Sequence, residues 1–483
     1  MNFRLIIKNL GIVMFAGAAA MLPSLFVSVI YGQGDMMAFL ITIIVMVLLG
    51  FYMFRIPVKN RNIYTRDGFA IASLAWILLS LFGALPYLLS GSIPSLVDAI
   101  FESVSGFTTT GSTTLKEIES LPRGILFWRS FTNWIGGMGV LVMILAVLPA
   151  AGASTVQMMK AESPGPDPGK LVPKIGQTAK ILYSMYIALT TIQVILLLIG
   201  GMPLYDTLVH SFSTAGTGGF SSMNLSVGAY NNAYYEVVIA VFMFIYGVNF
   251  SLYYQTLKGE IKNIFRDEEF RFYLFALAGA VLLITCNIYG SVFDNIWESL
   301  RHSLFQASSI MTTTGFSSAN FNLWPAFSKS ILVILMFIGA SAGSTGGGIK
   351  CIRFVLLFKT IKREIRRIIH PRSVYTVKYG GKTVDSNILS SIMNYIFVYI
   401  VVFTGALLII SLDGFDLVSN FTAVTAAISN IGPGLGIVGP VGSFTDYSAL
   451  SKIVLSLAML FGRLEIYPML ILFTPMFWKR VNI

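Results

Sequence analysis

The sequence predicts an all-α integral membrane protein with ten membrane spans and four re-entrant half-helices. Three observations lead to this fold class. Only 11% of the 483 residues are charged, whereas a soluble domain carries roughly 25%. Runs of about 20 apolar residues, the length that crosses a bilayer as a helix, recur along the whole chain. Between the later runs, a cluster rich in Gly, Thr and Ser appears four times.

The apolar runs define the ten candidate spans. A second run follows the first closely, and no A-x-A site lies between them, so we do not expect a cleaved signal peptide. The spans lie near residues 9–31, 36–55, 68–90, 124–150, 178–200, 233–256, 271–290, 327–358, 387–412 and 447–478.

Basic residues give the orientation of the spans. They cluster in alternate connections and near both ends of the chain, most densely within residues 350–382. Because cytoplasmic loops carry an excess of Lys and Arg, both termini and every second connection are predicted to be cytoplasmic. The net charge of +11 is thereby explained by topology, and we expect no binding to nucleic acid.

The composition also argues against a metal centre and against an enzyme. Cys286 and Cys351 stand in separate apolar stretches, and the chain has only three histidines, so neither a disulfide framework nor a zinc site is indicated. The outward-facing Asp, Glu and Ser residues show no nucleophile–base pairing, which makes a membrane enzyme the weakest hypothesis.

Four outer connections share one design. Each begins with an acidic residue, continues with about ten residues of helical pattern, too short to span a bilayer, and ends in a Gly/Thr/Ser cluster. This order predicts a re-entrant half-helix followed by a loop. A carboxylate near a helix start is favourable to the helix dipole, so we assign a structural role to the acids, which are Asp98, Asp206, Asp294 or Glu298, and Asp416.

The four clusters are copies of one motif. They comprise residues 106–112, 215–222, 311–318 and 429–434. The second and third share Gly-Phe-Ser-Ser, the first and third share Thr-Thr-Thr-Gly, and the fourth is the divergent copy. Aligned on one glycine each, they stand about 100 residues apart, which indicates repetition of a whole module. The aligned glycines are Gly111, Gly219, Gly315 and Gly432.

Such loops have the chemistry of a cation filter. Irregular backbone at membrane depth is tolerated where it lines a water-filled cavity, glycine allows the unusual φ values, and rings of carbonyls replace the hydration shell of a cation. Thr and Ser hydroxyls are expected to brace the loops from behind. The predicted filter residues are Thr109, Thr110, Gly111, Thr217, Gly218, Gly219, Thr313, Thr314, Gly315, Asn430, Ile431 and Gly432.

The eighth span is interrupted by small residues between positions 339 and 348. Glycine is poor in a helix interior, and the segment lacks the Lys-Ser/Thr of a phosphate-binding loop. One interpretation is close helix packing through small residues. The other is a flexible intramembrane loop below the filter that acts as a gate, formed by Gly343, Ser344, Thr345, Gly346, Gly347 and Gly348.

Arg463 is an ionisable residue inside the tenth span, where charge is costly. It is expected either to pair with Glu465 or another acid, or to place a positive charge near the pore in contact with the interrupted segment. Arg129, nearer the outer end of its span, is assigned a structural role, and Gly136, Gly137 and Gly139 indicate tight packing.

These motifs resemble the Trk/Ktr/HKT superfamily of cation transporters, and more narrowly its TrkH type, over nearly the whole chain. The resemblance implies four M1–P–M2 modules around one pseudo-fourfold pore, preceded by two extra spans. Glycine at all four filter positions implies a preference for potassium over sodium. The resemblance also favours the interpretation of residues 343–348 as a gate loop and implies that Arg463 lies below the filter. The implied boundaries are residues 1–66 for the extra spans and 67–160, 161–265, 266–370 and 371–483 for the modules.

The implied function is potassium uptake across a bacterial inner membrane by a homodimer, with potassium as the transported ion. Control by nucleotide is expected from a cytoplasmic ring of TrkA-type subunits, because the cytoplasmic segments of this chain are too short to bind a nucleotide. Residues 359–382 and 151–177 are the candidate docking surfaces, and contact of 359–382 with anionic lipid is the alternative. A K+/H+ or K+/Na+ symporter is the alternative function, with Glu102 and Glu465 as the candidate intramembrane acids.

Overall fold

The computed structural model describes residues 1–58, 64–139, 175–373 and 375–478. Within these ranges the chain is mostly helical, as predicted, and its strands are β1 (Lys378–Tyr379) and β2 (Lys382–Thr383), which form a short antiparallel hairpin. Two sequence predictions fall largely outside the described residues: the inner half of the span near 124–150, and most of the docking segment 151–177.

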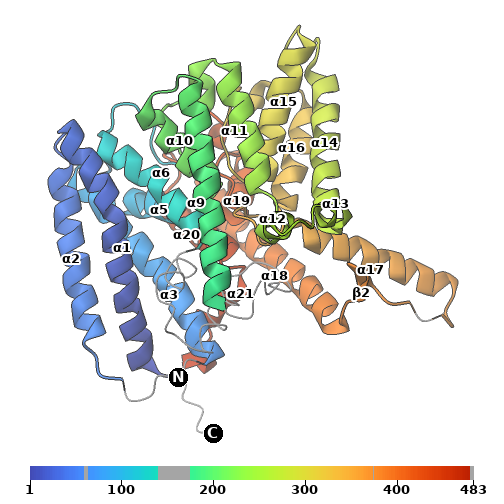
Figure 1. Cartoon of the computed structure of the whole chain (residues 1–483), viewed down its shortest axis with the longest axis horizontal. Coiled ribbons are helices and arrows are strands. Elements are labelled where there is room, and N and C mark those ends of the chain that lie inside the picture. Colours follow the sequence, from blue (N-terminus) through green and yellow to red (C-terminus); the bar gives the residue numbers. More distant parts are fainter. Residues whose placement is uncertain (59–63, 140–174, 374, 479–483) are drawn as a thin grey trace.

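The first two helices form a hairpin at one edge of the molecule (Figure 1). They are α1 (Phe3–Tyr31) and α2 (Met36–Phe54). A Cβ atom added at Gly11 would lie only 2.8 Å from the carbonyl oxygen of Gly50, so glycine permits the close approach of the two helices. Their outer faces expose large apolar side chains such as Phe26 and Leu48, which suits a surface that faces lipid.

The rest of the chain repeats one order of elements four times: a long helix, a short helix, an irregular loop and a third helix. The long helices are α3 (Thr65–Gly83), α9 (Ile175–Ile199), α14 (Glu268–Ile288) and α18 (Ser386–Ile410). The short helices are α5 (Leu96–Phe107), α10 (Leu204–Gly216), α15 (Ile296–Met311) and α19 (Leu417–Ile428). The third helices are α6 (Arg123–Gly137), α11 (Ala233–Tyr246), α16 (Ala326–Ile338) and α20 (Ala449–Arg463).

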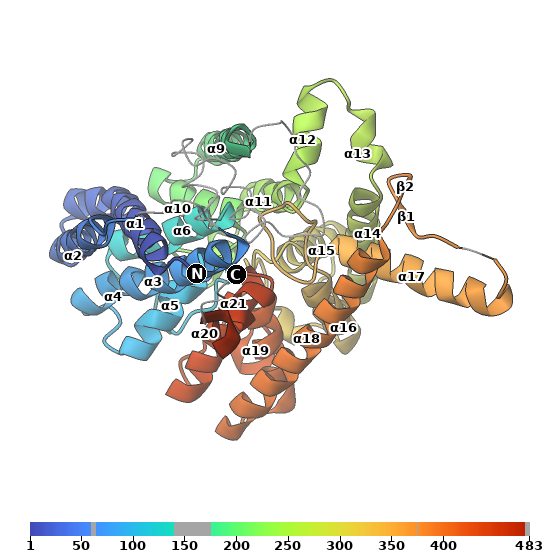
Figure 2. The same ribbon diagram turned by 90° about the horizontal axis from the view of Figure 1, so that it is seen from below.

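The remaining elements connect or extend these helices. They are α4 (Leu85–Leu89), η1 (Ser226–Tyr230), α12 (Phe250–Leu257), α13 (Lys262–Arg266), η2 (Phe321–Leu323), α17 (Cys351–Ile369), η3 (Ser411–Asp413), η4 (Gly436–Val438), α21 (Tyr467–Leu472) and α22 (Pro475–Trp478). Among them, the basic helix α17 projects away from the helical bundle (Figures 1 and 2).

The four units follow one another in a closed ring. The third helix of each unit packs on the short helix of the next: α6 on α10, α11 on α15, α16 on α19, and α20 back on α5. Figure 2 shows the units in colour order around a common centre. The cyclic order brings the four loops that follow the short helices together.

Six helical segments among the described residues are long and apolar enough to cross a membrane, and α11 with α12 makes a seventh if the pair is one span. That pair is bent by 90°, where the Asn249 side chain caps α12 by accepting from the N–H of Ser251 at 2.9 Å. The spans predicted near 124–150, 327–358 and 447–478 correspond to the shorter helices α6, α16 and α20. Ten complete spans therefore stay a prediction.

The two ends of the described chain lie on the same side of the molecule. The Phe3 ring stacks on the Trp478 ring with a centroid distance of 6.1 Å, and Arg66 donates to the carbonyl oxygen of Phe477. This arrangement is compatible with an even number of membrane crossings.

Candidate functional site

All four short helices end in the same backbone motif. The first residue after the helical turn has a positive φ in each: Thr109 (55°), Thr217 (54°), Thr313 (59°) and Asn430 (55°). The next N–H in each loop donates to the carbonyl oxygen five residues back: Thr110 to Ser105, Gly218 to Ser213 and Thr314 to Ser309 at 2.8 Å, and Ile431 to Ala426 at 2.9 Å. This is the Schellman termination, which favours Gly or Asn at the left-handed position. The three threonines there are strained, as is common at functional sites.

The aligned glycines close a ring. All four have positive φ, from 71° at Gly219 to 106° at Gly432. Each glycine faces a backbone carbonyl oxygen of the next loop. A Cβ atom added at Gly111 would lie 2.0 Å from the carbonyl oxygen of Gly218, and one added at Gly219 would lie 2.1 Å from that of Thr314. The corresponding distances are 2.0 Å from Gly315 to Ile431 and 2.8 Å from Gly432 to Thr110. Since no side chain fits at such distances, glycine is required for the loops to meet.

The four glycines also line one cavity of about 420 Å³. Its walls come from the segments that follow the glycines, including Thr113, Ser221, Ser317 and Val438. Residues from all four units therefore surround one common space.

Hydroxyl groups brace the first and third loops, as predicted. The Oγ1 atoms of Thr108 and Thr110 lie 2.8 Å apart, and those of Thr312 and Thr314 lie 2.8 Å apart. In the divergent fourth loop an amide takes this role, because Asn430 Nδ2 donates to Thr110 Oγ1 at 3.0 Å and to the carbonyl oxygen of Met459 at 2.9 Å. The fourth loop is thus joined to the first.

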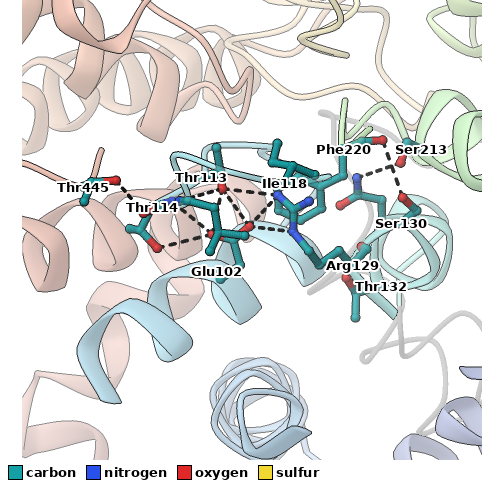
Figure 3. Close-up of polar contacts among 12 residues, drawn as sticks. Glu102, Thr113, Thr114, Ile118, Arg129, Ser130, Thr132, Ser213, Phe220 and Thr445 are labelled. Carbon is teal, nitrogen blue, oxygen red and sulfur yellow. Dashed lines mark hydrogen bonds and ion pairs between the residues drawn. The ribbon is translucent and has the colours of Figure 1, made fainter. Parts of the chain in front are cut away.

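A buried ion pair lies behind the first loop (Figure 3). Glu102 of α5 and Arg129 of α6 are 0% and 1% exposed, and their closest atoms are 2.6 Å apart. Glu102 also accepts from the hydroxyl of Thr113 at 3.0 Å and from the N–H of Thr114 at 3.1 Å. Arg129, to which the sequence interpretation assigns a structural role, thus pairs with Glu102, a brace that the sequence interpretation missed.

Histidines stand behind the second and third loops. His210 Nε2 lies 2.9 Å from Ser221 Oγ, and His302 Nδ1 lies 2.9 Å from Ser318 Oγ. His210 stands as far before Gly219 as Glu102 stands before Gly111. Aligning the half-helices on their glycines would therefore have revealed this pair of bracing residues.

The acids predicted near the half-helix starts lie there. Asp98, Asp206 and Glu298 fall in the first turns of α5, α10 and α15, and Asp416 caps α19 by accepting from the N–H of Ser419 at 3.0 Å. Of the two alternatives for the third unit, Glu298 rather than Asp294 is in the first turn. A carboxylate at this end stabilises the helix dipole, and each half-helix directs its negative end at the ring.

Residues 339–350 form an irregular loop between α16 and α17. The predicted break in this span is thus present, and positive φ at Gly339, Gly343 and Gly348 explains why no helix continues through it. The N–H of Gly347 donates to Thr313 Oγ1 at 2.6 Å, and the N–H of Gly348 donates to the carbonyl oxygen of Ser429 at 3.0 Å. Both partners precede their ring glycines, so the loop lies against the face of the ring opposite the cavity.

The other predicted gate residues belong to the same loop. Ser344 Oγ donates to the carbonyl oxygen of Ser341 at 2.6 Å, Thr345 Oγ1 donates to that of Tyr246 at 3.3 Å, and the carbonyl oxygen of Gly346 accepts from Lys350. The loop is therefore held by hydrogen bonds to α11 as well as to the ring.

Arg463, at the end of α20, binds this loop. Its guanidinium donates to the carbonyl oxygens of Thr345 at 2.9 Å and Gly137 at 2.8 Å, and also to that of Gly136. The predicted contact between Arg463 and the interrupted segment is present. Glu465, the acid considered as its partner, instead forms an ion pair with Arg353 of α17. Side chains two residues apart on a helix do not face each other, and α20 ends at Arg463.

Comparison with known proteins gives one consistent result. Residues 35–480 match the family model TrkH, described as a cation transport protein. The Trk system potassium uptake protein TrkH of Salmonella typhimurium is 39% identical over 99% of this chain and 100% of its own length. The Trk system potassium uptake protein TrkG of Escherichia coli K12 is 35% identical, with 99% of each chain covered. The crystal structure of the potassium transporter TrkH from Vibrio parahaemolyticus superposes with a TM-score of 0.89 at 36% identity, covering 99% of this chain and 100% of that one.

Proposed function

The chain belongs to the TrkH family of cation transport proteins, a family of transporters rather than enzymes, and we propose that it takes up potassium through a gated pore. The ring of four loops is its selectivity filter. The observation that carries this proposal is the contact of each ring glycine with a carbonyl oxygen of the next loop, together with the single cavity that all four glycines line. Potassium is the cargo named for the relatives.

The proposed filter acts through backbone carbonyls. Rings of carbonyl oxygens replace the hydration shell of a cation, and the negative ends of four half-helices add to the attraction. The filter comprises residues 109–111, 217–219, 313–315 and 430–432. Because an added Cβ at any ring glycine would displace the carbonyl of the next loop, a substitution there disturbs two loops at once.

The loop 339–350 is the proposed gate. It is hydrogen-bonded to Thr313 and to Ser429 on the face of the ring away from the cavity, and Arg463 ties it to α6. An ion that leaves the filter on this side meets the loop and a positive charge. Deleting residues 343–348 is therefore expected to raise flux, whereas unchanged flux would mean that the loop only packs.

The K+/H+ or K+/Na+ symporter is the less favoured alternative. The two acids considered from the sequence as proton carriers are both held in ion pairs, Glu102 with Arg129 and Glu465 with Arg353. A reversal potential that follows the K+ gradient and ignores pH and Na+ would exclude symport, whereas one that shifts with pH or Na+ would support it.

The assembly proposed around this pore follows the family resemblance. Residues 67–160, 161–265, 266–370 and 371–483 are the four M1–P–M2 modules, preceded by the spans within 1–66. The protein is proposed to act as a homodimer in a bacterial inner membrane, with both termini cytoplasmic. Regulation is assigned to a TrkA-type nucleotide-binding ring that docks on residues 359–382, since the relatives are named as parts of a Trk system.

Flux through purified protein tests the proposal. Wild type, a Gly315→Ser variant and a Gly405→Ser control are placed in liposomes with the regulatory partner, and uptake of K+, Rb+ and Na+ is compared. Gly405 lies in α18 with nothing within 4 Å of an added Cβ, so its variant should conduct as wild type does. Gly315→Ser should lose selectivity for K+ and Rb+ over Na+. A wild type that passes neither K+ nor Rb+ would overturn the proposed function.

A further inference from the structure

We propose that the buried pair of Glu102 and Arg129 determines the cation specificity of the pore, by positioning the segment that follows Gly111; this inference rests on the proposed function. Glu102 does not line the cavity above the ring, so it is a positioning residue that acts through the residues it holds. Arg129 does line that cavity, and it also acts as a positioning residue through its contacts with Thr113 and Phe220.

Glu102 and Arg129 fix the segment after the first filter loop by hydrogen bonds. Glu102 accepts from the Thr113 hydroxyl with both carboxylate oxygens, at 3.0 and 3.1 Å, and from the N–H of Thr114 at 3.1 Å. Arg129 adds a bond from its guanidinium to Thr113 Oγ1 at 3.2 Å. Bonds to charged groups are the stronger class of hydrogen bond, and here all of them converge on two adjacent residues.

The same segment is also hydrogen-bonded to the fourth loop. Ser112, between Gly111 and Thr113, donates its hydroxyl to the carbonyl oxygen of Gly432 at 3.1 Å. The carbonyl oxygens of Thr113 and Thr114 accept from the N–H of Phe444 at 2.8 Å and from the Thr445 hydroxyl. A shift of this segment therefore moves the fourth loop, the copy whose sequence diverges.

The third step reaches the second loop. The Arg129 guanidinium lies 4.1 Å from the centre of the Phe220 ring, and Phe220 directly follows Gly219. A cation placed over an aromatic face is attracted to it, more strongly in a desolvated site. One buried pair is thus connected to three of the four filter loops; Figure 3 shows its contacts with Thr113 and Thr114 and its position beside Phe220.

Burial of the pair is informative because ion pairs in apolar surroundings seldom add stability over apolar residues of the same size. Removing one partner is far more costly than removing both, since it leaves an uncompensated buried charge. A double variant should therefore regain stability that a single variant loses, so that an effect on selectivity can be measured apart from an effect on folding.

The test compares Glu102→Gln with the double variant Glu102→Gln/Arg129→Gln. We measure the melting temperature in detergent and the ratio of Na+ to Rb+ uptake in liposomes. The single variant should melt at a lower temperature than wild type. The double variant should recover most of that loss but raise the Na+/Rb+ uptake ratio by roughly tenfold, as expected when charge-assisted bonds are lost. A double variant with recovered melting and the wild-type ratio would overturn the proposal.

A second test variant and a control variant complete the experiment. Thr113→Val keeps the ion pair but removes the hydroxyl that Glu102 holds, so it should raise the ratio in the same direction by roughly threefold; a wild-type ratio there would contradict the inference even if the double variant does not fold. The matched control is Asp98→Asn/Lys452→Gln. That acid–base pair also joins a half-helix to a third helix, with Lys452 Nζ 2.6 Å from Asp98 Oδ1, and neither side chain hydrogen-bonds to a filter loop within the described residues, so its ratio should stay at the wild-type value. A wild type that conducts no Rb+ would instead contradict the proposed function.

Discussion

The two faces of the glycine ring are built differently. In the ring itself, all four loops share one Schellman termination and one glycine with positive φ. On the face away from the cavity, the third helices whose continuation is described end differently: α11 bends by 90° into α12, α16 gives way to the loop 339–350, and α20 ends at Arg463 before the left-handed residues Glu465 and Ile466. A ring of carbonyls needs the same backbone from every unit. A single obstruction needs only one unit to differ, and the others are free to diverge.

The largest expected effect is at the ring. Gly219→Ala places a Cβ about where the Thr314 carbonyl oxygen lies, at 2.1 Å, on a residue with φ of 71°. Strain and overlap of a few kcal/mol should lower Rb+ uptake into liposomes by about 100-fold. Gly279→Ala, in open space on α14, serves as the control. Uptake near the wild-type rate would show that the glycines are not tightly packed as described.

A smaller effect of opposite sign is expected at the proposed gate. Arg463→Gln removes guanidinium bonds to the carbonyl oxygens of Thr345 and Gly137, each contributing about 1.5–3 kcal/mol for a charged donor. Basal Rb+ flux without the regulatory partner should rise by about tenfold. Arg463→Lys should fall between the two, because an ammonium does not reproduce the guanidinium fork. A decrease in flux would place Arg463 in support of the open pore.

Thr313 and Thr109 occupy equivalent positions in the third and first loops but differ in the hydrogen bonds of their hydroxyl groups. Thr313 Oγ1 accepts from the N–H of Gly347 at 2.6 Å, whereas the buried Thr109 Oγ1 has no hydrogen-bond partner among the described residues. Thr313→Val should therefore raise basal flux by about fivefold, for one lost bond of about 1 kcal/mol, and Thr109→Val should change it less. Equal effects of the two variants would argue that the gate is not coupled to the third loop.

The smallest effect is expected where the ring departs from its own symmetry. Asn430→Thr gives the fourth loop the residue of the other three but removes the amide bonds to Thr110 Oγ1 and the Met459 carbonyl oxygen. Flux should persist, with the Na+/Rb+ uptake ratio raised about threefold. An unchanged ratio would indicate that the fourth loop needs only its backbone conformation.

The sequence predicted the ring better than the face beneath it, for a physical reason. A positive φ at a tight contact demands glycine, so Gly111, Gly219, Gly315 and Gly432 mark the same structure four times. Of the helix ends beneath the ring, the break between α16 and α17 was predicted from its small residues. The bend between Tyr246 and Phe250 was not, because Gly247 and the capping Asn249 lie inside an apolar run long enough to read as one span.

Side-chain partners were predicted least well. The pairing of Glu465 with Arg353 joins α17 to the segment after α20, a contact that sequence spacing does not reveal. Glu102 was considered as a proton carrier because an intramembrane acid is usually functional. In the structure it holds Thr113 and Thr114 instead. Aligning the units on their ring glycines pairs Glu102 with His210, which also contacts the segment beyond its glycine.

The central claim is that one cation pathway runs through all four loops. Anomalous diffraction from crystals grown in Rb+ tests it most directly. We predict Rb+ peaks at the centre of the ring, surrounded by the carbonyl oxygens of Thr110, Gly218, Thr314 and Ile431. A Rb+ peak outside the ring, with the ring centre empty in the same crystal, would contradict it.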